Sequence, residues 1–246
     1  MPDGAERIAS GLNGLVRQLE VVAHNAANAQ TAGFKRRVLT FEQEYQKSLE
    51  ALSGNRSLRS NPIQTRQEID FSQGRLIQTD RPLDIALEGR GFLTLQTPDG
   101  PMYTRNGCLQ INALGQLTDS QGRIVAGQNG PINLPADALG GDIQISQDGV
   151  VRIGTVQVGQ LRLADFGENE HRLIPSGFGV FAAPADVQPM PAAGVKVRQG
   201  YQESSNVQMI QEMVSMMTLS RLYEANMNVL RQQREASQAV LSAVNT

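Results

Sequence analysis

The sequence lacks tryptophan and has a single cysteine and two histidines among its 246 residues. One cysteine, Cys108, cannot form an internal disulfide, and no CxxC pair is present to hold zinc. His24 and His171 lack the H-x-x-x-H or H-x-E spacing of metal sites and are interpreted as surface or structural residues. No G-x-S-x-G motif points to a serine nucleophile. We therefore expect no enzyme activity and no catalytic, cofactor-binding or metal-binding residues.

A strong charge bias is also absent, since 22 Lys and Arg balance 24 Asp and Glu. This near-neutral charge argues against nucleic acid or an anionic membrane as a partner. The basic run Lys35-Arg36-Arg37 has no aromatic platform beside it and is interpreted as a solvated bend rather than a phosphate site. No run of 18 apolar residues predicts membrane insertion. The segment Met1–Gly4 does not begin a cleavable signal peptide, so any export is expected to proceed without cleavage.

Both ends of the chain show the apolar spacing of amphipathic helices. Apolar residues from Ile8 to Ala29 recur in steps of three and four, which predicts a helix over about 5–29 that stops before Gly33. A second helical stretch is predicted from Phe34 to Leu52 by the same spacing. The period returns after the possible N-cap Ser204 or Ser205 and continues almost to Thr246. The apolar residues expected to form an interface are Ile8, Leu12, Leu15, Leu19, Val22, Ile210, Met213, Met217, Tyr223, Met227, Leu230, Leu241 and Val244.

The middle of the chain shows a different pattern, with short runs of alternating apolar residues. Glycine-containing turn pairs interrupt these runs, and such pairs suit the positive φ angles of tight hairpins. The pairs are Asp99-Gly100, Asn106-Gly107, Gln121-Gly122, Asn129-Gly130 and Asp148-Gly149. The region is therefore predicted to be an antiparallel β domain.

These patterns predict an α+β fold with long N- and C-terminal amphipathic helices that pair as a coiled-coil-like stalk beside a central antiparallel β domain. The expected divisions are an N-terminal helix in 1–33, a partly helical connector in 34–74, the β domain in 75–200 and a C-terminal helix in 201–246. Each helix needs an apolar partner. That partner is either the other terminus, in a closed bundle, or a helix of a neighbouring subunit, in an open helical assembly.

Four stretches of the sequence resemble the rod and hook proteins of the bacterial flagellum. His24–Lys35 resembles their N-terminal signature at Asn25, Asn28, Thr31, Gly33 and Phe34, although Ala27 stands where the family usually has Leu. The other three stretches run from Asp80 to Phe92, from Tyr103 to Gly107 and from Gln199 to Val207. Together these matches extend over nearly the whole chain in the family's order.

The resemblance implies a structural subunit of the basal-body rod that polymerises through its terminal helices into a hollow, torque-transmitting drive shaft in the periplasm. It implies export by the flagellar type III apparatus, with copies of itself and other rod proteins as partners. The signature residues are then expected to serve export or assembly. Arg81–Asp84 favours the proximal rod subunits, whereas Val156–Leu161 resembles the distal ones.

Two alternatives belong to other functional classes. One is a soluble β-domain binding module with a helical dimerisation stalk, which predicts a defined dimer at every concentration. The other is a cell-wall glycan hydrolase, which predicts paired carboxylates in a cleft and the release of soluble fragments.

Overall fold

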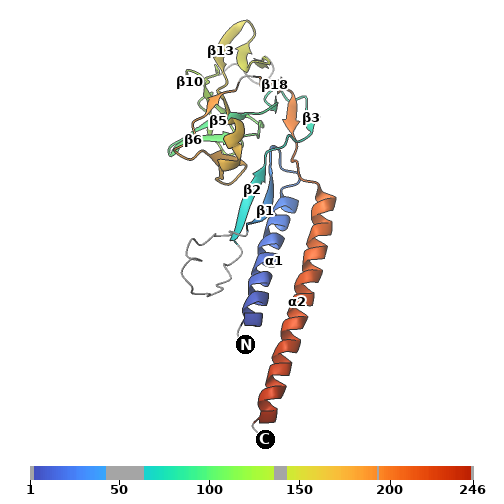
Figure 1. Ribbon diagram of the computed structural model, residues 1–246. Helices are drawn as coiled ribbons and strands as arrows, with labels where there is room; N and C mark the ends of the chain where they lie inside the picture. Colours follow the sequence, from blue (N-terminus) through green and yellow to red (C-terminus); the bar gives the residue numbers. More distant parts are fainter. Residues whose placement is uncertain (1–2, 43–63, 136–142, 193, 245–246) are drawn as a thin grey trace. The chain divides into compact units, whose positions relative to one another are not determined.

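The computed structural model describes residues 3–42, 64–135, 143–192 and 194–244 (Figure 1). The chain divides into two compact units. The helical unit consists of Met1–Ala27, Arg37–Glu68 and Gln208–Thr246, and the β unit consists of Asn28–Arg36 and Ile69–Val207.

Two helices dominate the helical unit. Helix α1 covers Asp3–Ala27 and helix α2 covers Met209–Val244, and the two lie side by side (Figure 1). On α1 the side chains of Leu12, Leu15 and Leu19 are half-buried, as expected for one face of a helix that packs against a neighbour. Among the described residues, neither helix is long and apolar enough to cross a membrane.

The helical unit also contains a two-stranded sheet, in which β1 (Arg36–Glu42) pairs with β2 (Gln64–Asp70). The second helix predicted from Phe34 is therefore wrong over β1, and the rest of that prediction, at 43–63, lies outside the described residues. The amide side chain of Asn25 explains part of the difference. It accepts from the Arg37 N–H (2.9 Å) and donates to the Arg37 carbonyl (2.8 Å), as a hydrogen-bonded residue of a neighbouring strand does.

The β unit is built from short, mainly antiparallel strands joined by tight turns. One sheet has the order β15-β16-β6-β5-β9-β8-β7, and β10 and β14 pair with β9 and β5 at its side. Separate pairings join β12 to both β11 and β13, β18 to β4, and β19 to β3. The element bounds are β3 Leu76–Gln78, β4 Ile85–Glu88, β5 Phe92–Thr97, β6 Gly100–Thr104, β7 Gln110–Ile111, β8 Leu117–Thr118, β9 Ile124–Gly127, β10 Gly130–Pro131, β11 Ile143–Ile145, β12 Val150–Ile153, β13 Val156–Gln160, β14 Leu163–Asp165, the 3-10 helix η2 Gly167–Arg172, β15 Ile174–Pro175, β16 Val180–Ala182, β17 Met190–Pro191, β18 Lys196–Gln199 and β19 Tyr201–Glu203.

Strand β5 divides the core of the β unit into an aliphatic and an aromatic part. Leu93 and Leu95 point into a cluster of Leu, Ile and Val side chains, while Phe92 points to the opposite face because side chains alternate along a strand. Phe92 makes edge-to-face contacts there with Phe166 and Phe181. Both faces of β5 are thus buried, which accounts for its uninterrupted Phe-Leu-Thr-Leu sequence.

Four of the five turn pairs join paired strands. Asp99-Gly100 connects β5 to β6, and the pairs ending in Gly122, Gly130 and Gly149 connect β8 to β9, β9 to β10 and β11 to β12. Asn106-Gly107 does not form a hairpin, because it leads from β6 towards β7 and these strands are not neighbours. Gly107 instead lies directly against the Ile85 carbonyl oxygen, where a Cβ atom has no room.

The C-terminal helix begins later than predicted. Residues Tyr201–Glu203 form β19, which pairs with β3, so helical hydrogen bonding can start only beyond them. The Ser205 hydroxyl accepts from the N–H of Val207 (3.1 Å) and thereby closes a turn ahead of the helix. Ser205 is consequently not the N-cap of α2, which starts at Met209.

Replacing Gly107 by Ala should destabilise the β unit, because the new methyl group would overlap the Ile85 carbonyl and force two backbone segments apart. Overpacking of this kind costs about 1–3 kcal/mol. Chemical denaturation monitored through the β unit measures the loss. Gly11→Ala is the matched control, because its Cβ meets open space in α1 and alanine favours helix by about 1 kcal/mol. Equal stability of the two variants would contradict this view of Gly107.

Candidate functional site

The second part of the signature stretch, from Asn28 onwards, forms a tight turn in the β unit. The Thr31 N–H donates to the Asn28 carbonyl (3.1 Å), and the Phe34 N–H donates to the Thr31 carbonyl (3.3 Å). Gly33 has a positive φ of 67°, and a Cβ at this position would lie 2.5 Å from the Asn106 nitrogen. Only glycine therefore fits between this turn and the end of β6.

Lys35, Arg105 and Glu203 form a buried ionic group that we call the Glu203 cluster. The Lys35 Nζ lies 2.6 Å from Glu203 Oε1, and the side chains of both residues are 0% exposed. Arg105 Nη1 lies 3.6 Å from Glu203 Oε2, and the Arg105 guanidinium stacks over the Phe92 ring at 5.2 Å. The cluster thus connects three segments that are far apart in the sequence.

Backbone groups complete the surroundings of this cluster. Lys35 Nζ donates to the Ser72 carbonyl (2.8 Å), and the Gly74 N–H donates to Glu203 Oε1 (2.9 Å). The Gly33 N–H donates to the Glu203 carbonyl (2.7 Å). These bonds compensate for much of the cost of moving charges out of water.

Burial is the main influence on the cations of the cluster. It lowers the pKa of Lys35 below its ordinary value, and the Glu203 carboxylate opposes that change. Burial also lowers the pKa of Arg105, again opposed first by Glu203. Loss of the Glu203 charge would leave both cations without their closest anion.

The stretch around Asp84 joins the same region. Asp84 is fully buried, and its Oδ2 accepts from the Thr79 hydroxyl (2.8 Å) and from Gln202 Nε2 (2.7 Å). The Gly200 N–H donates to the Asp84 carbonyl (2.8 Å). All four stretches that carry the family resemblance therefore meet within the β unit. Their polar residues hold segments together, a role that their spacing in the sequence does not reveal.

An open groove of about 660 Å³ lies beside the Glu203 cluster. Asp70, Glu168, Glu170 and His171 line it together with Arg105. Burial raises the pKa of the Glu170 carboxyl. His171 is exposed and its Nδ1 lies 2.7 Å from the Glu168 carbonyl oxygen, so this histidine belongs to the local turn. In the described part of the chain, no group of His, Cys, Asp and Glu has the arrangement of a metal site.

The predicted interface residues of α1 lie on one side of the helix. Leu12, Leu15, Leu19 and Val22 are half-buried in the helical unit. Ile8 lies within α1, and its side chain is outside the described part of the structure. At 100° per residue Leu12, Leu15, Leu19 and Val22 share one face of α1, and α1 contacts α2.

The predicted interface residues of α2 fall into two groups. Met227 and Leu230 are half-buried, whereas Ile210, Met213, Met217 and Tyr223 are exposed. Leu241 and Val244 lie in the last turns of α2, and their side chains are not described.

A different set of residues is buried in the first half of α2, the helix that contacts α1. Glu212 is buried, and Met216 and Leu219 are half-buried at helical spacing from it. The sequence pattern missed this stripe because it contains a charged residue. The apolar spacing predicted instead Ile210, Met213 and Met217, which the structure leaves exposed.

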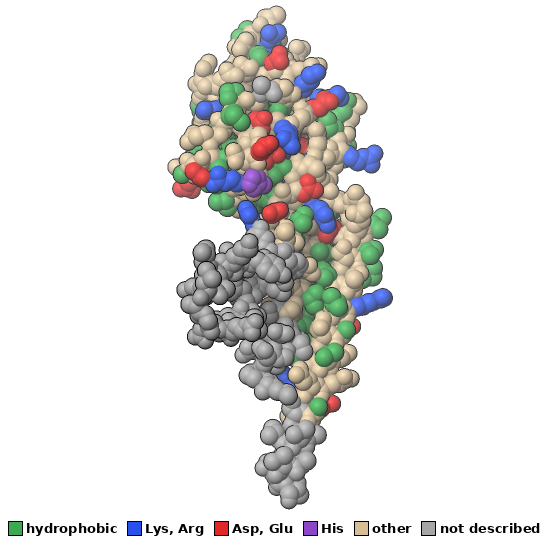
Figure 2. Space-filling model, viewed as in Figure 1, with side chains coloured by type: hydrophobic (Ala, Val, Ile, Leu, Met, Phe, Trp, Pro, Cys, Tyr) green, Lys and Arg blue, Asp and Glu red, His purple; other side chains and the backbone are tan. Residues whose placement is uncertain are grey.

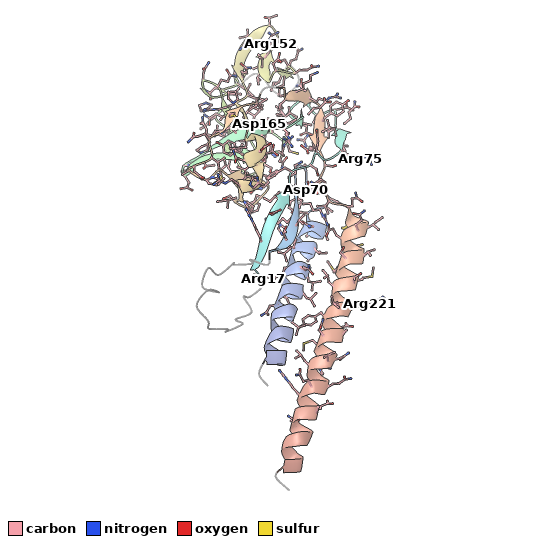
Figure 3. The ribbon with its side chains drawn as sticks, in the orientation of Figure 1. Arg17, Asp70, Arg75, Arg152, Asp165 and Arg221 are labelled. Atoms are coloured by element: carbon pink, nitrogen blue, oxygen red, sulfur yellow. The ribbon has the colours of Figure 1, made fainter. Side chains whose placement is uncertain are left out.

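We define the outer α2 face as Ile210, Met213, Val214 and Met217. Their exposed fractions are 78%, 52%, 53% and 56%. At 100° per residue they lie roughly opposite the buried stripe of Glu212, Met216 and Leu219. Figure 2 shows apolar side chains along this helix, and Figure 3 labels Arg221, one turn beyond Met217. Contiguous exposed apolar side chains of this kind mark interaction surfaces.

Glu203→Gln should lower the free energy of unfolding by about 3–5 kcal/mol, because it leaves Lys35 and Arg105 buried without an anion. Lys35→Met should cost less, since Glu203 keeps Arg105 and the Gly74 N–H as partners. Urea denaturation of both variants gives the comparison. If Lys35→Met lowered the free energy of unfolding more than Glu203→Gln does, Glu203 would not be the central residue of the cluster.

Cys108 should be poorly reactive in the native protein. Burial, with a smaller contribution from Asp84, raises the pKa of its thiol to about 11 from the model-compound value of 9.0. At pH 8 this decreases the thiolate fraction, and so alkylation by iodoacetamide, by about a hundredfold. The chain unfolded in urea is the control. Equal rates in the folded and unfolded chain would contradict the raised pKa.

Comparison with known proteins connects these features to one family. Residues 86–153 match the family described as flagellar hook protein FlgE/F/G D1 domain, and residues 198–243 match the flagellar basal body rod FlgEFG protein C-terminal family. The first match contains Arg105 and the second contains Glu203 and the outer α2 face.

Relatives of both rod subtypes align with most of the chain. It is 34% identical to the flagellar basal-body rod protein FlgG of Agrobacterium fabrum, over 90% of this chain and 92% of that protein. It is 33% identical to the flagellar basal-body rod protein FlgF of Salmonella typhimurium, over 87% of each. A FlgF of Caulobacter vibrioides is 29% identical over 92% of this chain and 91% of that protein. The chain belongs to the family of flagellar basal-body rod proteins.

Proposed function

We propose that this chain is a structural subunit that polymerises through its terminal helices into the hollow, torque-transmitting rod of the flagellum. The observation that carries the proposal is the outer α2 face. The helical unit leaves the apolar stripe of α1 half-buried and four adjacent apolar side chains of α2 exposed. In a closed bundle on a monomeric protein these apolar side chains would stay exposed to water, whereas in a polymer a neighbouring subunit covers them.

The free energy gained by burying the outer α2 face is of the size expected for one contact that is repeated many times in an assembly. Full burial of a Val, Ile or Met side chain stabilises by about 1.5–3 kcal/mol. The four residues are about half exposed, so each contributes roughly 1 kcal/mol when a neighbour covers it. That sum is too small to hold two subunits together against the cost of association. The same contact repeated along a helical array can hold a rod and transmit torque.

The remaining parts of the proposal follow from the family. Copies of this chain and other rod proteins are the proposed partners, and the periplasmic part of the basal body is the proposed location. Export by the flagellar type III apparatus, without cleavage, delivers the subunit. The signature residues Asn25 to Phe34 are proposed to act in export or assembly, although Gly33 and Lys35 also have the structural contacts described above.

The rod subtype is proposed to be proximal. The Arg81–Asp84 stretch supports this choice, and it ends at the buried Asp84. The distal subtype is the alternative, since FlgG and FlgF relatives match the chain almost equally well. Rescue of strains that lack one or the other subunit distinguishes the two.

Met213→Asp should abolish rod assembly and motility without lowering the melting temperature of the purified chain. The side chain is 52% exposed in the monomer, so a carboxylate there is solvated, but in an assembled interface the same charge would be buried. The measurements are a swarming assay, basal-body isolation and a melting curve.

Thr218→Asp is the matched control for this change. Thr218 is exposed on the same helix, about 140° around the helix axis from Met213. It should leave assembly intact. Normal rods with Met213→Asp would remove the outer α2 face from the interface, and a large fall in melting temperature would show that Met213 belongs to the monomer's own core.

The two alternatives make opposite predictions for the purified protein. A stalked binding module gives a dimer at all concentrations in light scattering, whereas a rod subunit is mostly monomeric until it assembles. A glycan hydrolase would use the carboxylates of the groove and would release soluble fragments from cell-wall material. We expect no such release, and Glu170→Gln should leave motility unchanged.

A further inference from the structure

Phe178 is an exposed aromatic residue in a conformation that disfavours it. Its side chain is 78% exposed, and its φ of 46° lies in the left-handed region. Gly177 and Gly179 flank it in the turn between β15 and β16, and glycine is the residue that adopts such a φ without strain. Among the described phenylalanines, Phe178 alone is both highly exposed and at a positive φ, and it lies at the tip of a hairpin. An outlier of this kind in a surface turn supports a functional role.

The turn holds Phe178 in a defined position. The Val180 N–H donates to the Gly177 carbonyl (3.0 Å), and the Ser176 N–H donates to the Val180 carbonyl (2.9 Å). The Thr104 hydroxyl donates to the Gly179 carbonyl (2.9 Å) and ties the turn to β6. The ring is thus presented on a rigid support, so little conformational entropy is lost when it is covered.

A pocket of about 270 Å³ lies at the other end of the strand pair formed by β16 and β6. Its apolar lining includes Pro101, Met102, Pro184 and Pro189, and the volume accommodates a phenyl ring. The pairing of Val180 with Thr104 and of Ala182 with Met102 places the turn at one end of β16 and the pocket at the other. At about 3.3 Å per residue the two are separated by roughly 13 Å, beyond the reach of a phenylalanine side chain.

We propose that Phe178 of one subunit inserts into this pocket of a second copy of the chain. Ring and pocket are different surfaces of the β unit, so the contact runs from head to tail and can continue along an open assembly. The inference rests on the proposed rod function and adds to it a contact between β units, separate from the outer α2 face.

The size of the contact supports a neighbour in a polymer as the occupant. One inserted aromatic side chain buries about 150–250 Å². A stable two-body interface needs at least about 1,000 Å². The contact is thus far too small to form a dimer by itself, and it becomes effective only where other contacts already bring subunits together.

Photo-crosslinking tests the proposal on the full chain. The chain carries p-benzoylphenylalanine in place of Phe178 and is expressed in flagellated cells, and the rods are irradiated after assembly, when other contacts already hold neighbouring subunits together. We expect crosslinked dimers of the chain in which position 178 of one copy is joined to peptides within 99–103 or 182–189 of another. Crosslinks within one chain, crosslinks to other surfaces, or no crosslinks would each overturn the proposal.

Substitutions provide the second measurement. Phe178→Gly and the pocket-filling Ala185→Trp should each decrease rod assembly by about tenfold, as expected for loss of a central aromatic anchor. Phe178→Gly should leave the melting temperature unchanged or raise it, because it relieves the strained φ. A fall in assembly is then not a folding defect.

Leu114→Ser is the matched control, since Leu114 is 79% exposed at a turn outside both surfaces. It should assemble normally. Normal assembly of Phe178→Gly, combined with failure of Met213→Asp, would overturn the Phe178 contact and leave the proposed rod function standing. Normal assembly of both variants would remove both the Phe178 contact and the outer α2 face from the rod interface.

Discussion

The burial of one carboxylate, Glu203, is the constraint on which the β unit depends. A buried anion requires cations and N–H donors around it, and these come from Lys35, Arg105 and Gly74. Meeting that requirement brings together the end of the signature turn, the end of β6 and the last strand before α2. The segments are then close enough that only glycine fits at Gly33 and Gly74.

The signature stretch therefore has a structural role in the folded chain, in addition to its proposed role in export or assembly. Gly33 and Lys35 hold the start of the β unit to its end, and Asn25 fixes the backbone of Arg37 in the helical unit. The same short stretch therefore contributes to both units. A change in it alters local structure as well as any recognition by a partner.

A rod subunit must remain a monomer before assembly and become part of a stiff structure afterwards. The outer α2 face and Phe178 suit that requirement, because each exposes apolar surface too small to hold a dimer. Contacts that are individually weak add up only in a repeated array. The near-neutral net charge of -2 keeps repulsion between stacked copies low.

The sequence by itself determined the two terminal helices and most hairpin turns, because apolar periodicity and glycine at positive φ are local properties. The apolar residues of α1 also indicated the face that packs in the helical unit. Only the tertiary structure decided that Arg36–Glu42 is a strand, that Tyr201–Glu203 belongs to the β unit, and which face of α2 stays exposed. Those outcomes depend on residues that are distant in the sequence. Asn25 bonds the backbone of Arg37, and β3 pairs with β19. Glu212 is buried, and an apolar pattern does not predict the burial of a charged residue.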